Sequence, residues 1–253
     1  MTNAERYHFA DFTRDNYRRL LRLAAERYVF RTFADFDRGE RFVIWRHDVD
    51  CSMHGALKFA RIEADEGVRA TYFVDFHSEF YNLLEREISN GVQAIARLGH
   101  AVGLHFDSHY YDVQDEGRLE RLVDLEKRLV EQLFERECAA VSFHISTPFT
   151  ESCRRERYAG LINANAEYFK SEVGYCSDSN GYWRFRRLQD VLTAAADERL
   201  QVLTHPELWQ EQVMSPRQRI DRCIEGRAAS TRRWYAEVLA KAGRVNVDWD
   251  DES

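Results

Sequence analysis

Residues 42–50 have the sequence FVIWRHDVD, in which four apolar residues run directly into a cluster of charged residues and a histidine. The apolar part is short and consists of aromatic and β-branched side chains, as buried parallel strands do. The stretch therefore predicts a buried strand with polar chemistry at its carboxyl end. Further runs of this kind follow at 70–74, 101–104, 139–143, 173–176 and 200–203.

Helical stretches separate the strand-like runs. The segment 13–28 carries leucine and alanine on one face among arginine and glutamate, and Thr13 is a suitable N-cap. The alternation of strand and helix, repeated about six times, predicts an α/β protein with a parallel sheet that is closed or nearly closed. The other expected helices lie at 53–66, 88–98, 117–136, about 156–161, 185–197 and 215–242, the last with Ser215 before Pro216 as its start signal.

The chain has 253 residues, of which 44% are hydrophobic, so it can form a core without disulfides. No repeat or flexible linker divides it. We expect a single domain over 1–253, with a helical N-terminal cap at 1–40 and a helical C-terminal extension at 211–253.

Charge and cysteine usage restrict the class of protein. A net charge of −7 does not suit a nucleic-acid binder, which usually presents a basic face. No run approaches the roughly 18 apolar residues that span a bilayer. The N-terminus lacks the layout of a signal peptide, and the five cysteines form no Cys-x-x-Cys pair. We expect a cytoplasmic protein with free thiols, and the oligomeric state stays open.

Histidine or aspartate follows five of the six strand-like runs. In parallel α/β folds the carboxyl ends of the strands meet on one face, where active sites lie. Residues distant in the sequence should therefore be neighbours there. They are Asp48 and Asp50 after the first run, His105 and His109 after the third, then His144, Asp178 and His205.

These residue types suit metal-assisted hydrolysis. His105 and His109 are four apart, so on a helical turn they share a face and can hold one metal ion. One aspartate completes a His₂Asp set with open coordination positions, which fits Zn²⁺ best and also suits Co²⁺, Ni²⁺, Mn²⁺ or Fe²⁺. Asp48 and Asp50 point the same way in an extended segment, so one can bind metal and the other act as base. His205 can protonate a leaving group.

Three motifs resemble those of the polysaccharide deacetylase family, the NodB homology domain: RHDVD at 46–50, HFDSH at 105–109 and LTHP at 203–206. The resemblance covers about residues 42–210. It implies a distorted (β/α) barrel of about six to seven parallel strands with an added N-terminal helix, and removal of acetyl groups from sugars with a divalent metal. Carried over by motif, Asp48 is the base, Asp50 with His105 and His109 binds metal, and His205 is the general acid.

The sequence departs from the family pattern in two places. Val49 separates two aspartates that are usually adjacent, so the roles of Asp48 and Asp50 can be exchanged. The third motif usually supplies an arginine that orients the base, but the matching segment 142–149 has none. Arg46, Arg184 and His144 are the candidates to replace it. Asp178 is expected to hold His205 in the right tautomer.

The sequence predicts a metal-dependent hydrolase that removes an acetyl or formyl group from an amino sugar, either a small acylated sugar or an activated saccharide. Aromatic faces stack on sugar rings, which favours the aromatic members of the substrate-binding set. Two alternatives stay open: hydrolysis of another C–N bond, such as an allantoinase-like amide, and a non-catalytic carbohydrate-binding or assembly protein. The expected substrate-binding residues are His144, Arg46, Tyr81, Trp183, Arg184 and Trp209.

Overall fold

The computed structural model of the chain describes residues 1–247, and β2 (Phe42–Val49) is its central strand. β2 pairs in parallel with β3 (Thr71–Val74) on one side and β9 (Arg199–Thr204) on the other. Within residues 1–247, nine strands form one sheet in the order β6-β7-β5-β4-β3-β2-β9-β8, with β1 paired to β2. The remaining strands are β1 (Val29–Arg31), β4 (Ala101–Asp107), β5 (Cys138–His144), β6 (Arg157–Tyr158), β7 (Leu161–Asn163) and β8 (Gly174–Ser177).

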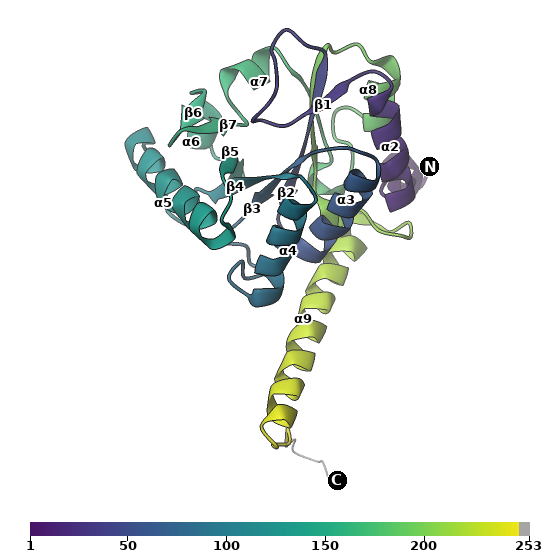
Figure 1. Cartoon of the computed structure of the whole chain (residues 1–253). Helices are drawn as coiled ribbons and strands as arrows, with labels where there is room; N and C mark the ends of the chain where they lie inside the picture. Colours follow the sequence, from purple (N-terminus) through teal and green to yellow (C-terminus); the bar gives the residue numbers. More distant parts are fainter. Residues whose placement is uncertain (248–253) are drawn as a thin grey trace.

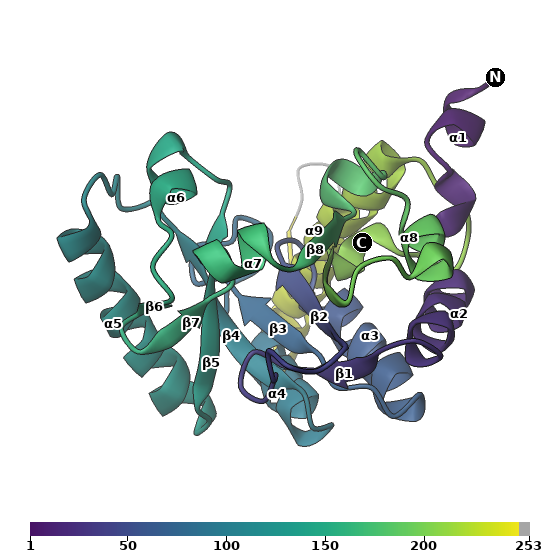
Figure 2. The ribbon, with the colours of Figure 1, turned by 90° about the horizontal axis from the view of Figure 1, so that it is seen from above.

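The sheet curls into an open barrel. Adjacent strands pair in parallel all the way from β7 to β8. Among the described strands only β6 runs antiparallel, to its partner β7. The two ends of the strand order, β6 and β8, do not pair with each other. Figure 2 shows the strands in an arc with α2 to α5 outside it. The predicted α/β fold with a curled, mostly parallel sheet is confirmed.

Alternation along the strands creates two apolar cores. On β2, Val43 and Trp45 face the outer helices, and Phe42 and Ile44 face the inside of the curl. The inner core is small and mostly aromatic, with Phe73 as another member. This inner core fills the amino-terminal half of the curl. Arg46 and Asp48, which continue the inner face of β2, therefore lie next to apolar side chains on their amino-terminal side.

Most helices begin at the residues that the sequence marks. Thr13, Ser52 and Ser215 are N-caps whose side chains accept a backbone N–H of the first turn, which satisfies a donor that the helix leaves unpaired. The long α9 runs away from the rest of the structure (Figure 1). The helices are α1 (Asn3–Arg6), α2 (Arg14–Ala25), α3 (Met53–Asp65), α4 (Arg86–Arg97), α5 (Glu116–Phe134), α6 (Pro148–Ser152), α7 (Glu167–Ser171), α8 (Leu188–Ala194) and α9 (Pro216–Lys241), with 3₁₀ turns at Phe9–Asp11, Ser179–Gly181 and Pro206–Leu208.

The prediction of a helix at about 156–161 is wrong. This segment forms β6 and the start of β7, and the helix lies earlier, at α6. Thr147 caps α6 and Pro148 occupies its first position, a start signal that the sequence analysis did not use. No helix among the described residues is long and apolar enough to cross a membrane. Residues 248–253, the end of the expected C-terminal extension, lie outside the described residues.

A buried polar network joins the outer face of the sheet to its helices. The carboxylate of Glu63 on α3 accepts hydrogen bonds from the hydroxyls of Tyr17 and Tyr72 and lies 2.6 Å from His47 Nε2. The other ring nitrogen of His47 is 2.8 Å from the Thr204 hydroxyl on β9. Burial raises the pKa of Glu63, but the charge and hydrogen bond of His47 outweigh it and lower the net pKa. The network ties α2, α3, β2, β3 and β9 together.

We predict that Glu63→Gln lowers the free energy of unfolding by about 2–4 kcal/mol, because it removes a buried charge and leaves donors unpaired. Urea unfolding measures the difference. Glu225→Gln, the same substitution at an exposed position of α9, is the control and should change stability by less than about 0.5 kcal/mol. Equal stability of the two variants would show that the network contributes nothing to stability.

Candidate active site

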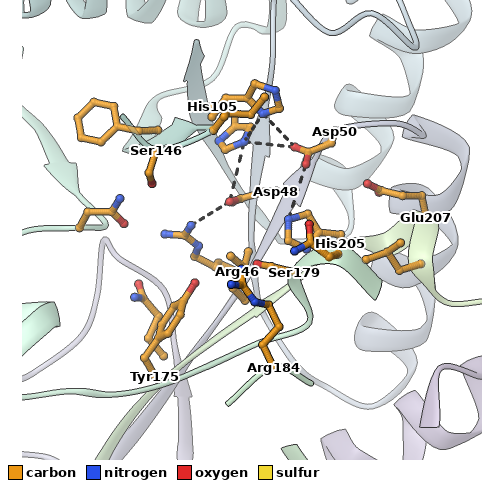
Figure 3. Close-up of a pocket in the computed structure, with 18 of the residues that line it drawn as sticks. Arg46, Asp48, Asp50, His105, Ser146, Tyr175, Ser179, Arg184, His205 and Glu207 are labelled. Carbon is orange, nitrogen blue, oxygen red and sulfur yellow. Dashed lines mark hydrogen bonds and ion pairs between the residues drawn. The ribbon is translucent and has the colours of Figure 1, made fainter. Parts of the chain in front are cut away.

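Histidines and aspartates from four strands meet at the carboxyl end of the curled sheet. Asp48 is on β2 and Asp50 follows it, while His105 is on β4, His144 ends β5 and His205 follows β9. All five side chains line one cavity of about 940 Å³. Figure 3 shows four of them, labelled, directed toward a common centre. The expected convergence at the carboxyl ends therefore occurs in this structure.

Asp50, His105 and His144 form a group that can hold a metal ion. His105 Nε2 lies 3.2 Å from Asp50 Oδ1 and 3.1 Å from His144 Nδ1, and His144 Nδ1 lies 3.6 Å from the same Asp50 oxygen. Burial raises the pKa of Asp50, but hydrogen bonds from His105 and His144 outweigh it and bring the pKa well below its usual range. In the same way, burial lowers the pKa of His144, and Asp50 raises it to a net value of about 9.

The three ligand atoms fit a tetrahedral cation. With metal–ligand bonds of about 2.1 Å, tetrahedral geometry keeps ligand atoms about 3.4 Å apart, close to the separations found here. Asp50 Oδ1 is buried, and both imidazole nitrogens point to it. His105 Nδ1 is 2.7 Å from the Ser142 hydroxyl, the kind of contact that fixes the tautomer of a metal ligand. The donor set of one carboxylate and two imidazoles suits Zn²⁺ among other divalent metals.

His109 is not part of this group. Its side chain is exposed, and Nε2 lies 3.1 Å from the carbonyl oxygen of Ile145. The spacing argument assumed a helical turn, but His105 lies in a strand and the chain turns after Asp107, whose side chain accepts the N–H groups of His109 and Tyr110. The two histidines therefore share no face. The structure brings His144 to the position that the sequence analysis gave to His109.

Asp48 lies beside the metal-ligand group and is held by two neighbours. Arg46 Nη2 donates to Asp48 Oδ2 at 2.9 Å, and the Ser142 hydroxyl lies 3.5 Å from Oδ1. His105 Nε2 is 3.9 Å from Asp48 Oδ2. Of Arg46, Arg184 and His144, the residues that the sequence offers in place of the missing arginine, Arg46 is the one that donates a hydrogen bond to Asp48. Asp50, rather than Asp48, adjoins both imidazoles, which favours the roles that the motif assigned.

His205 adjoins the group on the side of Asp50 and is fixed by Asp178. His205 Nε2 lies 3.6 Å from Asp50 Oδ2, and Nδ1 lies 2.6 Å from Asp178 Oδ1. Asp178 is fully buried and also accepts the His205 backbone N–H and the Trp209 indole N–H, the latter at 2.7 Å. Burial lowers the pKa of His205, but the charge of Asp178 outweighs it and raises the pKa to about 10.

The aromatic residues expected to bind substrate do not line this cavity. The Tyr81 side chain is buried, and its hydroxyl donates to the carbonyl oxygen of Val49. Trp183 stacks on Phe12 and donates its indole N–H to Asp11. Trp209 is 1% exposed and donates its indole N–H to the Asp178 carboxylate. Each satisfies its polar atom within the fold, whereas Arg184 does line the cavity.

The sequence analysis missed two residues of the site, Ser142 and Glu207. Ser142 precedes His144 by two residues, so both face inward on β5, and this spacing could have revealed it. Glu207 lines the cavity, is 3% exposed and has an unpartnered Oε2 atom. Burial and then the charge of Asp50 raise the pKa of Glu207 to about 8. Its position two residues after His205 is the only signal for it in the sequence.

Comparison with protein-family models finds no match, and comparison with curated proteins finds none either. The similar solved structures include carbohydrate esterases and peptidoglycan deacetylases, the kind of protein that the motifs resemble. A family 4 carbohydrate esterase from Bacillus anthracis is 14% identical with a TM-score of 0.46, over 83% of this chain and 86% of that one. The catalytic domain of a peptidoglycan N-acetylglucosamine deacetylase from Eubacterium rectale is 15% identical with a TM-score of 0.46, over 77% and 87%.

A wild-type CE4 family pseudoenzyme from Bacillus anthracis is also similar, with 12% identity and a TM-score of 0.42. That similarity covers 77% of this chain and 63% of the pseudoenzyme. All three are similarities of fold at low identity, so the roles of the site residues rest on the motifs and on the geometry described above.

We predict that His144→Ala weakens Zn²⁺ binding by more than about a hundredfold, because it removes one of three ligands. Isothermal titration calorimetry on metal-depleted protein measures the affinity. His109→Ala is the matched control and should bind Zn²⁺ as the wild type does. The opposite result, loss of binding in His109→Ala and retention in His144→Ala, would restore the ligand set expected from the sequence.

Proposed function

We propose that the chain is a metal-dependent hydrolase that removes an N-acyl group, acetyl or formyl, from an amino sugar. The observation that carries the proposal is that three groups adjoin one another in one cavity. They are the Asp50, His105 and His144 group, Asp48 with its hydrogen bond from Arg46, and His205 with its contact to Asp178. Asp50, His105 and His144 would bind the metal. The acyl amino sugar as substrate comes from the motif resemblance, and the geometry is compatible with it.

Asp48 acts as the general base. A divalent cation at such a site polarises an acyl carbonyl and makes water more acidic. Asp48 takes the proton of the attacking water, because its carboxylate lies next to the ligand group without belonging to it. The hydrogen bond from Arg46 and the proximity of Ser142 keep this carboxylate in one orientation. Proton transfer to a positioned base contributes about a hundredfold to ten-thousandfold to the rate.

His205 acts as the general acid. The departing amine must gain a proton, and Nε2 of His205 faces the cavity beside Asp50 while Nδ1 is held by Asp178. The buried carboxylate of Asp178 favours the protonated imidazole and fixes the ring plane. Trp209 in turn holds Asp178 through its indole N–H. His205 and Asp48 thus contact different members of the ligand group, as acid and base in one hydrolysis require.

Asp48→Asn should lower kcat by about a hundredfold or more and leave Zn²⁺ affinity within about twofold, because the amide accepts no proton but keeps the shape. The assay is release of free amine from N-acetylated and N-formylated amino sugars, with calorimetry for the metal. Glu151→Gln, which changes another carboxylate of the same cavity, is the control. Full activity of Asp48→Asn would refute the role of Asp48 as base.

Asp178→Asn should lower kcat by about tenfold or more, because the amide no longer stabilises protonated His205. Activity should fall on the alkaline limb of the kcat–pH profile as His205 loses its proton, and this limb should move to lower pH in the Asp178→Asn variant because Asp178 no longer raises the pKa of His205. Asp190→Asn, at an exposed position on α8, is the control. A lower kcat with an unmoved pH profile would mean that Asp178 supports the fold but not the acid.

A further inference from the structure

Three arginines border one side of the cavity, and two of them come from segments that pack together. Arg46 lies on β2, Arg184 follows the turn at Ser179–Gly181, and Arg217 is in the first turn of α9. A Cβ atom on Gly181 would lie 2.9 Å from the Pro216 side chain, so the turn and the start of α9 are in close contact. Figure 3 shows Arg46 and Arg184 on the side of Asp48 away from His105.

Two of these three arginines, Arg184 and Arg217, have no carboxylate partner within residues 1–247. The ion pairs found over residues 1–247 include neither Arg184 nor Arg217, and both side chains are exposed. Arg46 is 3% exposed and pairs with Asp48 through Nη2, while its Nε and Nη1 atoms have no hydrogen-bond partner. Asp48 matches the charge of Arg46, so the unmatched positive charge on this side of the cavity comes from Arg184 and Arg217, and it favours a negatively charged group in the cavity.

The carboxylates that line the cavity do not pair with Arg184 or Arg217. Asp48 is bound to Arg46, and Asp50 faces His105 and His144. Glu151, on the α6 wall, lies 3.9 Å from Lys170. Glu207 lies on the far side of Asp50 from Arg46 (Figure 3). The amino end of α9 also borders the arginine side and adds the positive end of a long helix dipole.

We propose that the substrate carries a negatively charged group, a carboxylate or a phosphate, which binds between Arg46, Arg184 and Arg217. The inference rests on the proposed function, since it concerns the same cavity. A cavity of about 940 Å³ is near the upper end of the range for small-molecule sites, so it has room for such a group besides an acylated sugar ring. The substrate is then an acidic, phosphorylated or phosphate-activated amino sugar.

The test is direct binding of three sugars that carry no acyl group: glucose, glucuronate and glucose 6-phosphate. Calorimetry should give an affinity about tenfold to a hundredfold higher for one or both charged sugars than for glucose. The tighter of the two identifies the group as carboxylate or phosphate. Raising NaCl from about 50 mM to about 500 mM should weaken binding of the charged sugar and not of glucose.

The double variant Arg184→Gln/Arg217→Gln should reduce this preference by about tenfold, whereas Arg232→Gln, at an exposed position on the outer part of α9, should not. Equal affinity for the three sugars, unchanged binding in the double variant, or inorganic phosphate binding as tightly as glucose 6-phosphate would overturn the inference. Charged sugars that bind without any amine release from acylated substrates would overturn the proposed hydrolysis instead. Equal amine release from neutral and charged acylated sugars would overturn the inference and leave the hydrolysis intact.

Discussion

The site depends on the register in which the parallel strands pair. β4 and β5 pair so that His105 lies opposite Ser142 and Asp107 opposite His144, and β2 pairs with β9 so that His47 lies opposite Thr204. These registers bring residues from separate strands to one level inside the curl. At this level His105 contacts Ser142, His144 and Asp50 inside the curl. Asp48, His105 and His144 lie within strands, and Asp50 and His205 follow directly after the ends of β2 and β9.

Buried charge is matched on both faces of the same strands. Inside the curl, Asp48 pairs with Arg46. Outside it, His47 pairs with Glu63 and contacts Thr204. Because Asp48 follows His47 and His205 follows Thr204, the outer network holds the backbone from which Asp48 and His205 project. A buried ion pair is a weak source of net stability, but breaking one is costly, so both pairs restrict the positions of these strands.

Much of the fold and part of the site could be predicted from the sequence. Apolar runs with charged ends revealed the main strands and the residues that meet there, because both follow from strand alternation. The grouping of His144, rather than His109, with Asp50 and His105 could not be predicted from spacing, since four-residue separation brings side chains together only on a helix and His105 is in a strand. That Tyr81 and Trp183 lie outside this cavity could not be predicted, because the sequence does not show which aromatic residues satisfy their polar atoms within the fold. The short strands β1, β6 and β7 carry too few residues for a pattern.

The alternation of inner and outer residues on β2 has a consequence for how such a protein can change. Deleting one residue within Phe42–Val49 would rotate every later side chain of the strand by half a turn, directing His47 inward and Asp48 toward the helices. Core packing and chemistry would be lost in the same event. Loops beyond the strand ends accept changes of length more readily than strands do, so substrate preference can change there while the residue spacing within β2 is kept.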